Sequence, residues 1–181
     1  MQRLLSSLIS DEFCWDSQNS SKEVHFSSDF RHVFLFESNY LFRSIIGSRP
    51  FMDGSHYWEI VADARTEHEL KVGVTLRQKF SVTNSFCDYD FGFGFYGNGE
   101  LRHNSNSEGR KYGKQFKKTG VLGVCLDMDK GQLSFSLNGK YCGVAFESQA
   151  LRKGPIWPAV SLLHHAGFTL VSGLKKPSIF I

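Results

Sequence analysis

The chain has 181 residues and a formal net charge of +3; 41% of its residues are hydrophobic and 17 are phenylalanine. A chain of this length can bury a core without disulfides or metals, and so small a net charge does not require a nucleic-acid or membrane partner. The four cysteines lack metal-ligand spacing and no segment resembles a signal peptide or a membrane span, so we expect an intracellular, cytoplasmic location.

The first fifty residues contain two regions of different character. Residues 1–10 carry leucine and isoleucine at helical spacing, which predicts a short N-terminal amphipathic helix or the end of a linker. Residues 13–28 are polar and rich in serine. A turn at 27–29 then leads into a strand around Val33 and Leu35.

Short strands follow between residues 56 and 101. In residues 56–62, Tyr57 and Glu59 alternate with Trp58 and Ile60, and we interpret Trp58 as core packing. Residues 71–75 form the next predicted strand. The polar and aromatic segment 77–90 is expected to be a loop that crosses one end of the fold. Alternating Phe and Gly over 91–96 then precede a Gly-Asn-Gly turn and a strand that begins at Leu101.

The stretch from 120 to 146 carries the strongest signals. Residues 132–137 alternate strictly, which predicts a half-buried strand with Ser134 and Ser136 toward solvent. The flanking turn residues are Asp129-Lys130-Gly131 and Asn138-Gly139, and the second pair is typical of a type I′ hairpin turn. Strands at 157–163 and 168–171 follow. Many short strands with regular turns predict an all-β fold, a two-sheet antiparallel β-sandwich.

Patterns associated with catalysis or metals are weak. Residues 92–97 match G-x-G-x-x-G, but a nucleotide site needs a following helix and a turn stands there instead. His164 and His165 are adjacent, so on a strand they would face opposite ways, and no further ligand lies nearby in sequence. There is no G-x-S-x-G motif. We therefore expect no enzyme activity, no metal and no cofactor.

The segment Arg110 to Lys118 holds five positive charges in nine residues, with Tyr112 and Phe116 between them. Basic residues interleaved with aromatic ones can bind single-stranded nucleic acid. A solvated loop at a strand edge is the more common role of such a run, and the rest of the chain has no broad basic stripe. Nucleic acid is therefore an unlikely partner by sequence, and RNA binding through this segment is kept as an alternative.

Three ordered motifs resemble the SPRY domain. They are LDMDKGQLSFSLNGKYCGVAF in the centre, RPFMDGSHYWEI at 49–60, which is similar to the opening PF-x-x-G-x-HYWEV strand, and PAVS at 158–161. FSSDFRHVFLF at 26–36 resembles part of the PRY extension. The resemblance implies a concanavalin-like sandwich with a PRY segment at 11–50 and a SPRY core at 51–176, together one globular domain.

The resemblance also implies a function. SPRY domains recognise a protein or peptide ligand, often as the substrate-recruiting part of a ubiquitin ligase or scaffold whose other domains bind the ligase machinery. By analogy we expect a surface built from three loops, around 42–44, 77–89 and 163–165. Its candidate partner-binding residues are Arg43, Arg77, Phe80, Tyr89, Leu163, His164 and His165.

Two departures and one rival bear on this expectation. Relatives with a SOCS box or F-box carry Trp-Gly-Trp where residues 93–95 read Phe-Gly-Phe. The SOCS-box type carries Val-Trp-Gly where 163–165 stand, so its preference for an acidic, asparagine-rich peptide is not carried over. Lectin-like carbohydrate binding is the rival, with Arg102-His103-Asn104 as a faint sugar-binding set.

Overall fold

The structure is a computed structural model that describes residues 11–181, so the helix predicted over residues 1–10 lies outside the described residues. The described chain consists of strands joined by turns and two short 3-10 helices, η1 and η2. In chain order the elements are β1 (Val24–Phe26), β2 (His32–Leu35), β3 (Arg43–Ile46), β4 (Ser55–Ala62), β5 (Leu70–Thr75), η1 (Phe86–Asp88), β6 (Gly92–Tyr96), β7 (Glu100–His103), β8 (Val121–Asp127), β9 (Gln132–Leu137), β10 (Lys140–Glu147), η2 (Gln149–Arg152), β11 (Trp157–Leu162) and β12 (Gly167–Val171).

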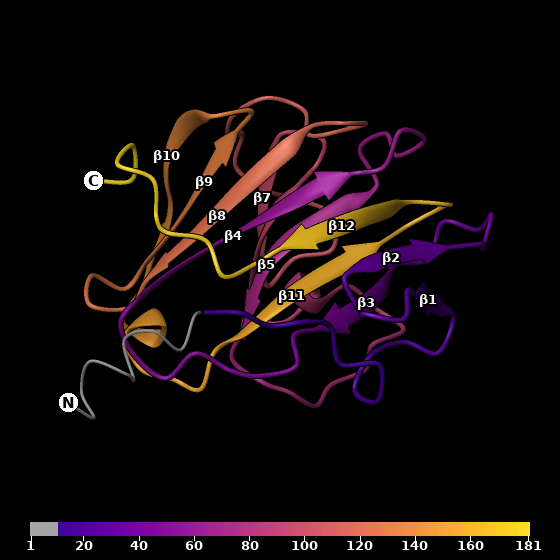
Figure 1. The fold of residues 1–181 in the computed structure, drawn as a ribbon, viewed down its shortest axis with the longest axis horizontal. Coiled ribbons are helices and arrows are strands. Elements are labelled where there is room, and N and C mark those ends of the chain that lie inside the picture. The colour runs from indigo at the N-terminus through magenta and orange to yellow at the C-terminus, as the bar shows by residue number, and fades with distance from the viewer. Residues whose placement is uncertain (1–10) are drawn as a thin grey trace.

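The strands form two antiparallel sheets that pack face to face (Figure 1). The larger sheet has the order β1-β2-β12-β4-β8-β9-β10, and the smaller one has the order β3-β11-β5-β6-β7. This confirms the predicted all-β, two-sheet antiparallel sandwich. The first three strands contribute to both sheets, because β2 pairs with β12 and β3 pairs with β11.

The central meander has the register expected from its turns. Asn138 and Gly139 both have positive φ, 50° and 78°, as a type I′ turn requires. They join β9 to β10, and Leu137 pairs with Lys140 across the turn. Strand β10 then runs irregularly along β9, with register shifts on either side of Val144. A bulged edge strand of this kind discourages pairing with another chain.

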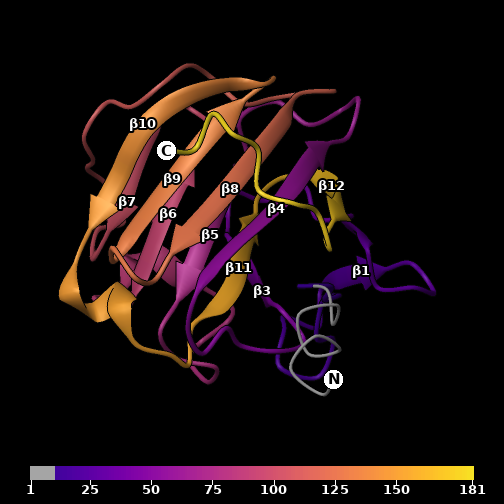
Figure 2. The same ribbon diagram turned by 60° about the vertical axis from the view of Figure 1, so that its left-hand side comes forward.

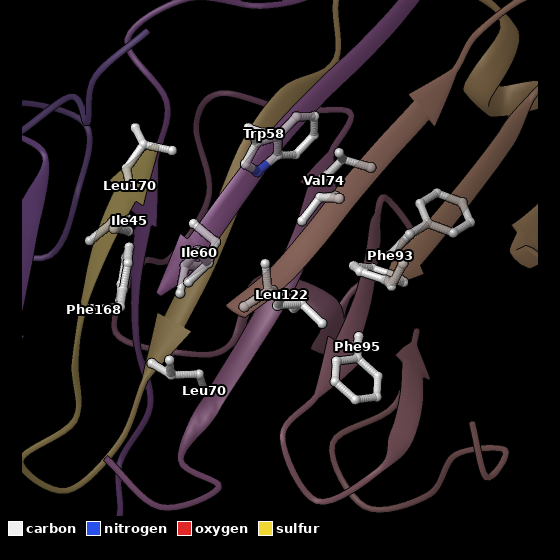
Figure 3. Packing of buried hydrophobic residues seen from close by; sticks show 14 of the residues in the cluster. Ile45, Trp58, Ile60, Leu70, Val74, Phe93, Phe95, Leu122, Phe168 and Leu170 are labelled. Atoms are coloured by element: carbon white, nitrogen blue, oxygen red, sulfur yellow. The ribbon is translucent and has the colours of Figure 1, made fainter. Parts of the chain in front are cut away.

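The core lies between the inward faces of the two sheets (Figure 3). Trp58 and Ile60 of β4 are fully buried there, which confirms the interpretation of Trp58 as packing. Val74 and Phe95 of the smaller sheet belong to the same core cluster. Each fully buried side chain of this size contributes about 2 kcal/mol of hydrophobic stabilisation relative to an exposed one.

The outer face of β4, β8 and β9 is covered by the C-terminal residues, which cross it toward β10 (Figure 2). Leu174 and Phe180 pack there on Tyr57. Ser134 and Ser136 on the same face are only 6% and 3% exposed, so the prediction that they face solvent is wrong. Alternation located the outer face correctly, but no local pattern revealed that a distant segment covers it.

One end of the sandwich carries several connections that are far apart in sequence. The loop after β11 meets β5 there, since the Leu163 amide donates to the Glu69 carbonyl oxygen. The connection before β8 joins the same end, because the Lys118 amide donates to the Thr66 carbonyl oxygen. We call this the His164 end. The turn at 138–139 and the start of β3 also lie there.

Candidate protein-binding surface

The turn at residues 163–166 presents both histidines in an unusual backbone conformation. His164 and His165 have φ values of 44° and 60°, in the left-handed region that few residues other than glycine adopt. A second segment of the chain holds this turn. The His165 amide donates to the Glu37 carbonyl oxygen, and His164 Nδ1 lies 2.9 Å from the Ser38 carbonyl oxygen. Residues 37–38 therefore hold the backbone of the turn and the His164 imidazole in place.

Arg43 holds the same segment in place through Glu37. Its Nε and Nη2 atoms donate to the two carboxylate oxygens of Glu37 at 2.8 and 3.0 Å, a bidentate pair. The hydrogen bond from Arg43 lowers the pKa of Glu37, and the same bond raises the pKa of Arg43. The guanidinium is mostly buried. Arg43 thus positions residues 37–42 instead of presenting a free cation.

The segment held by Arg43 displays apolar side chains to solvent. Phe36, Tyr40 and Leu41 are 60%, 73% and 57% exposed, the highest values for aromatic or aliphatic residues before Ile181. The Tyr40 ring stacks on the His164 imidazole, with centroids 4.7 Å apart and planes at 9°. Sequence reasoning missed Phe36, Tyr40 and Leu41. The run Tyr40-Leu41-Phe42 between polar residues could have indicated them, because its apolar side chains have no strand partner.

Arg77, Phe80 and Tyr89 form a separate cluster with Phe91. The Arg77 guanidinium lies 4.8 Å from the centroid of the Phe91 ring, and the Tyr89 ring stacks on Phe91, with centroids 4.8 Å apart and planes at 9°. Phe80 packs against both rings. This arrangement satisfies Arg77 with a cation–π contact.

The two groups of predicted residues lie at opposite ends of β5. Leu70 pairs with Leu162 beside the histidine turn, whereas Thr75 pairs with Trp157 just before Arg77. Five residue steps along a strand span about 17 Å. The single surface expected from three loops is therefore divided in two, with Arg43, Leu163, His164 and His165 in one group and Arg77, Phe80 and Tyr89 in the other. Leu163 itself is buried.

The segment 77–90 lies across the outer face of the smaller sheet. Ser44 of β3 makes two hydrogen bonds to this segment. The Ser44 amide donates to the Val82 carbonyl oxygen, and the Ser44 hydroxyl donates to the Asn84 carbonyl oxygen. The predicted loop also contains η1, whose Phe86 and Cys87 are fully buried. Burial raises the pKa of the Cys87 thiol to about 11, so it stays protonated at neutral pH and is a poor nucleophile.

A buried lysine lies under this segment. The Lys71 side chain is 2% exposed, and its Nζ atom lies 4.1 Å from the Phe42 ring centroid and 5.2 Å from that of Tyr96. Its acidic neighbour is Asp88, whose Oδ1 is 3.6 Å away. Burial raises the pKa of Asp88, and this effect outweighs the opposing attraction of Lys71. Lys71 thus packs against the Phe42 ring, and its pairing with Asp88 is offset in part by the desolvation of the Asp88 carboxylate.

The residues proposed for sugar binding are engaged within the fold. Arg102 is buried and pairs with Glu100, while the His103 ring stacks on Phe93 at 4.1 Å and its Nδ1 lies 2.8 Å from the Gly92 carbonyl oxygen. Of the three tryptophans, Trp15 and Trp58 are buried. The structure therefore provides no support for a lectin-like platform around residues 102–104.

The aromatic residues of the basic segment are also buried. Phe116 is fully inside the core, and the Tyr112 hydroxyl donates to the Gly143 carbonyl oxygen. The basic residues remain at the surface, but the RNA hypothesis also requires exposed aromatic rings, and both rings of this segment are buried. Residues 92–97 form β6 and a turn, not the strand-to-helix junction of a nucleotide site.

Residues 11–181 lack two features of other protein classes. No group of three or more histidine, cysteine or acidic side chains is arranged to hold a metal ion. No helix in this part of the chain has the length and hydrophobicity needed to cross a membrane.

Comparison with known proteins identifies the fold. A family model described as "SPRY domain" matches residues 55–175. The SPRY domain of human HERC1 superposes with a TM-score of 0.67 and 16% identity, covering 90% of this chain and 99% of that one. A human SPRY domain gives 0.73 and 18%, covering 86% and 98%. The TRIM65 PSpry domain gives 0.69 and 20%, covering 93% and 94%.

Proposed function

The chain belongs to the SPRY domain family, a family of protein-interaction modules, and we propose that it recognises a peptide or surface segment of a partner protein at the His164 end. The binding surface consists of Phe36, Tyr40, Leu41 and His164, which we call the Tyr40 surface. The observation that carries this proposal is the stacked pair of Tyr40 and His164 on a segment that Glu37 and Arg43 hold in place.

The physical argument concerns exposure and rigidity together. Large apolar side chains in solvent give up no hydrogen bonds on binding, and they gain about 25 cal/mol for each Å² that a partner covers. A rigid loop also loses little conformational entropy on binding. Interface hot spots are enriched in tyrosine, and a polar rim around them excludes water. Tyr40 is both exposed and held in place, so it meets both conditions. Arg43 instead positions the segment through Glu37, and Leu163 packs in the interior.

We further propose that the domain recruits substrates for a larger ubiquitin-ligase-type or scaffold protein in the cytoplasm. Support comes from the family and from the parent proteins of two structural neighbours, HERC1 and TRIM65, by analogy alone. The cluster of Arg77, Phe80, Tyr89 and Phe91 is the second candidate surface. It presents a cation and aromatic rings, although these largely satisfy one another.

The test compares capture of proteins from cell lysate by the wild type and by a Tyr40→Ala, Leu41→Ser variant. A matched control, Met52→Ala with Ile179→Ser, removes two exposed apolar side chains elsewhere. We expect partners retained by the wild type and the control to be lost from the Tyr40 variant, with all three melting at the same temperature. Equal capture by all three would refute the Tyr40 surface, and loss with Arg77→Ala alone would assign the site to the other cluster.

A further inference from the structure

A second surface with different chemistry lies where residues 113–120 run beside the β9–β10 hairpin. Two hollows open on either side of Leu137 and Asn138. One, of about 430 Å³, is lined by Lys117 and Lys118. The other, of about 380 Å³, is lined by Lys114, Lys140, Gly113, Tyr141 and Cys142. We call the pair the lysine groove.

The lysine groove is positively charged. All four of its lysines are exposed. Within residues 11–181, Lys118 pairs with Glu67 at 2.9 Å, and no carboxylate forms an ion pair with Lys114, Lys117 or Lys140. Three uncompensated charges around one concave surface attract acidic groups over a distance of about 8 Å at physiological ionic strength.

The hollow beside Tyr141 has apolar walls. Leu137, Tyr141 and Cys142 line it together with Lys114 and Lys140. The Tyr141 ring is itself held edge-on by Phe180 of the C-terminal segment, with centroids 5.3 Å apart. The wall is therefore already formed before any ligand arrives. Apolar walls inside a basic rim match a ligand that carries both an apolar side chain and flanking carboxylates.

We propose that the lysine groove binds an acidic protein segment that carries one large apolar residue. The apolar residue enters the hollow between Lys114 and Lys140, and carboxylates on either side of it pair with the lysines. This site is independent of the Tyr40 surface, because it shares no residue with it. Nucleic acid fits less well, since Tyr112 and Phe116 are buried and Tyr141 is the one aromatic ring that lines these hollows.

The experiment uses a fluorescein-labelled twelve-residue peptide of alternating Glu and Ser with one central Phe, titrated against the intact chain by fluorescence anisotropy. The test variant is Lys114→Glu with Lys140→Glu. The control variant, Lys22→Glu with Lys153→Glu, makes the same charge change at exposed lysines outside the groove. Variants are compared only if their melting temperatures agree with that of the wild type.

We expect the wild type and the control to bind the peptide equally and the test variant to bind at least tenfold more weakly. Replacing the central Phe of the peptide by Ser should weaken binding at least fivefold. Equal binding of the Phe and Ser peptides, or no loss in the test variant, would overturn the proposal. So would tighter binding of a single-stranded oligouridine with a log–log salt slope near −3, the value for about four phosphate contacts. Preferential capture by phosphatidylserine vesicles would overturn it as well.

Discussion

The buried pair of Lys71 and Asp88 provides the sharpest test of the energetics beneath the Tyr40 surface. At 3.6 Å and an effective dielectric constant of about 20, two unit charges attract by about 5 kcal/mol. The raised pKa of Asp88 shows that desolvation cancels part of this attraction. Removing one partner leaves a buried charge uncompensated, which typically costs 3–5 kcal/mol.

Asp88→Asn should cost less than that range and lie within about 1 kcal/mol of the wild type, because the raised pKa of Asp88 means that folding favours a neutral side chain here over the ionised one. Lys71→Met should cost more, about 1–2 kcal/mol, since it removes the charge that compensates ionised Asp88, which must then take up a proton. The double variant should lie within about 1 kcal/mol of the wild type, because no unpaired charge remains.

Urea unfolding at pH 7, followed by tryptophan fluorescence, measures all four free energies in one double-mutant cycle. A cost of about 3 kcal/mol or more for Asp88→Asn would show that the attraction of the ion pair outweighs the desolvation of Asp88 and would refute the reasoning. The pH dependence gives an independent sign. A carboxyl group whose pKa is raised by folding binds its proton more tightly in the native state, so its contribution to stability falls as the pH rises above about 3.9, the ordinary Asp value. Lys71→Met should show this fall more steeply than the wild type.

Three further outcomes follow from other contacts. Folding lowers the pKa of Glu37, so the stability that its ionised form provides is present above about pH 4.3 and is lost as the pH falls through its folded pKa. Glu37→Gln should remove this loss of stability in acid, measured by urea unfolding at successive pH values. An unchanged pH profile would argue against the pair with Arg43. Phe180→Ala should lower the free energy of unfolding by about 2–3 kcal/mol and speed the reaction of Cys125 with a thiol reagent, in a background where the partly exposed cysteines are replaced by serine. An unchanged reaction rate would mean that the C-terminal segment does not protect Cys125. Gly139→Ala should lower stability by only about 1 kcal/mol, because its φ is 78° but no atom lies within 4 Å of the added methyl group; a much larger loss on thermal melting would point to a contact at this turn.

The sequence was sufficient for the sandwich because the decisive signals were local. The alternation over residues 132–137 and the Asn138-Gly139 turn depend on neighbours along the chain, and both appear in β9, β10 and the turn between them. The prediction that the outer face is exposed was wrong because its burial depends on residues distant in sequence. Ser134 pairs with Cys125, on which a segment about fifty residues later in the chain packs, and the side-chain period shows which face a residue is on but not what covers that face.

The candidate site was only half accessible from the sequence for a related reason. Family resemblance pointed to His164 and Arg43, and the structure places them together. It could not indicate that Arg77 lies at the far end of β5, because that depends on strand register. It also could not show that Arg43 is occupied by Glu37, which leaves Tyr40 as the exposed group. The binding role of all these residues remains a prediction.

The pairing of early strands with late ones also constrains how this protein can be made. Strand β2 pairs with β12, and β3 pairs with β11, so the smaller sheet is not complete until residue 162 has been synthesised, and the larger one not until residue 171. Chains dominated by such distant pairings fold slowly, and before folding is complete their unpaired strand edges can associate with other chains. A recombinant fragment that begins at residue 51 would leave the same edges of β11 and β12 permanently open. Synthesis at reduced temperature, or with chaperones present, should therefore raise the yield of folded protein far more than it would for a helical bundle of equal length.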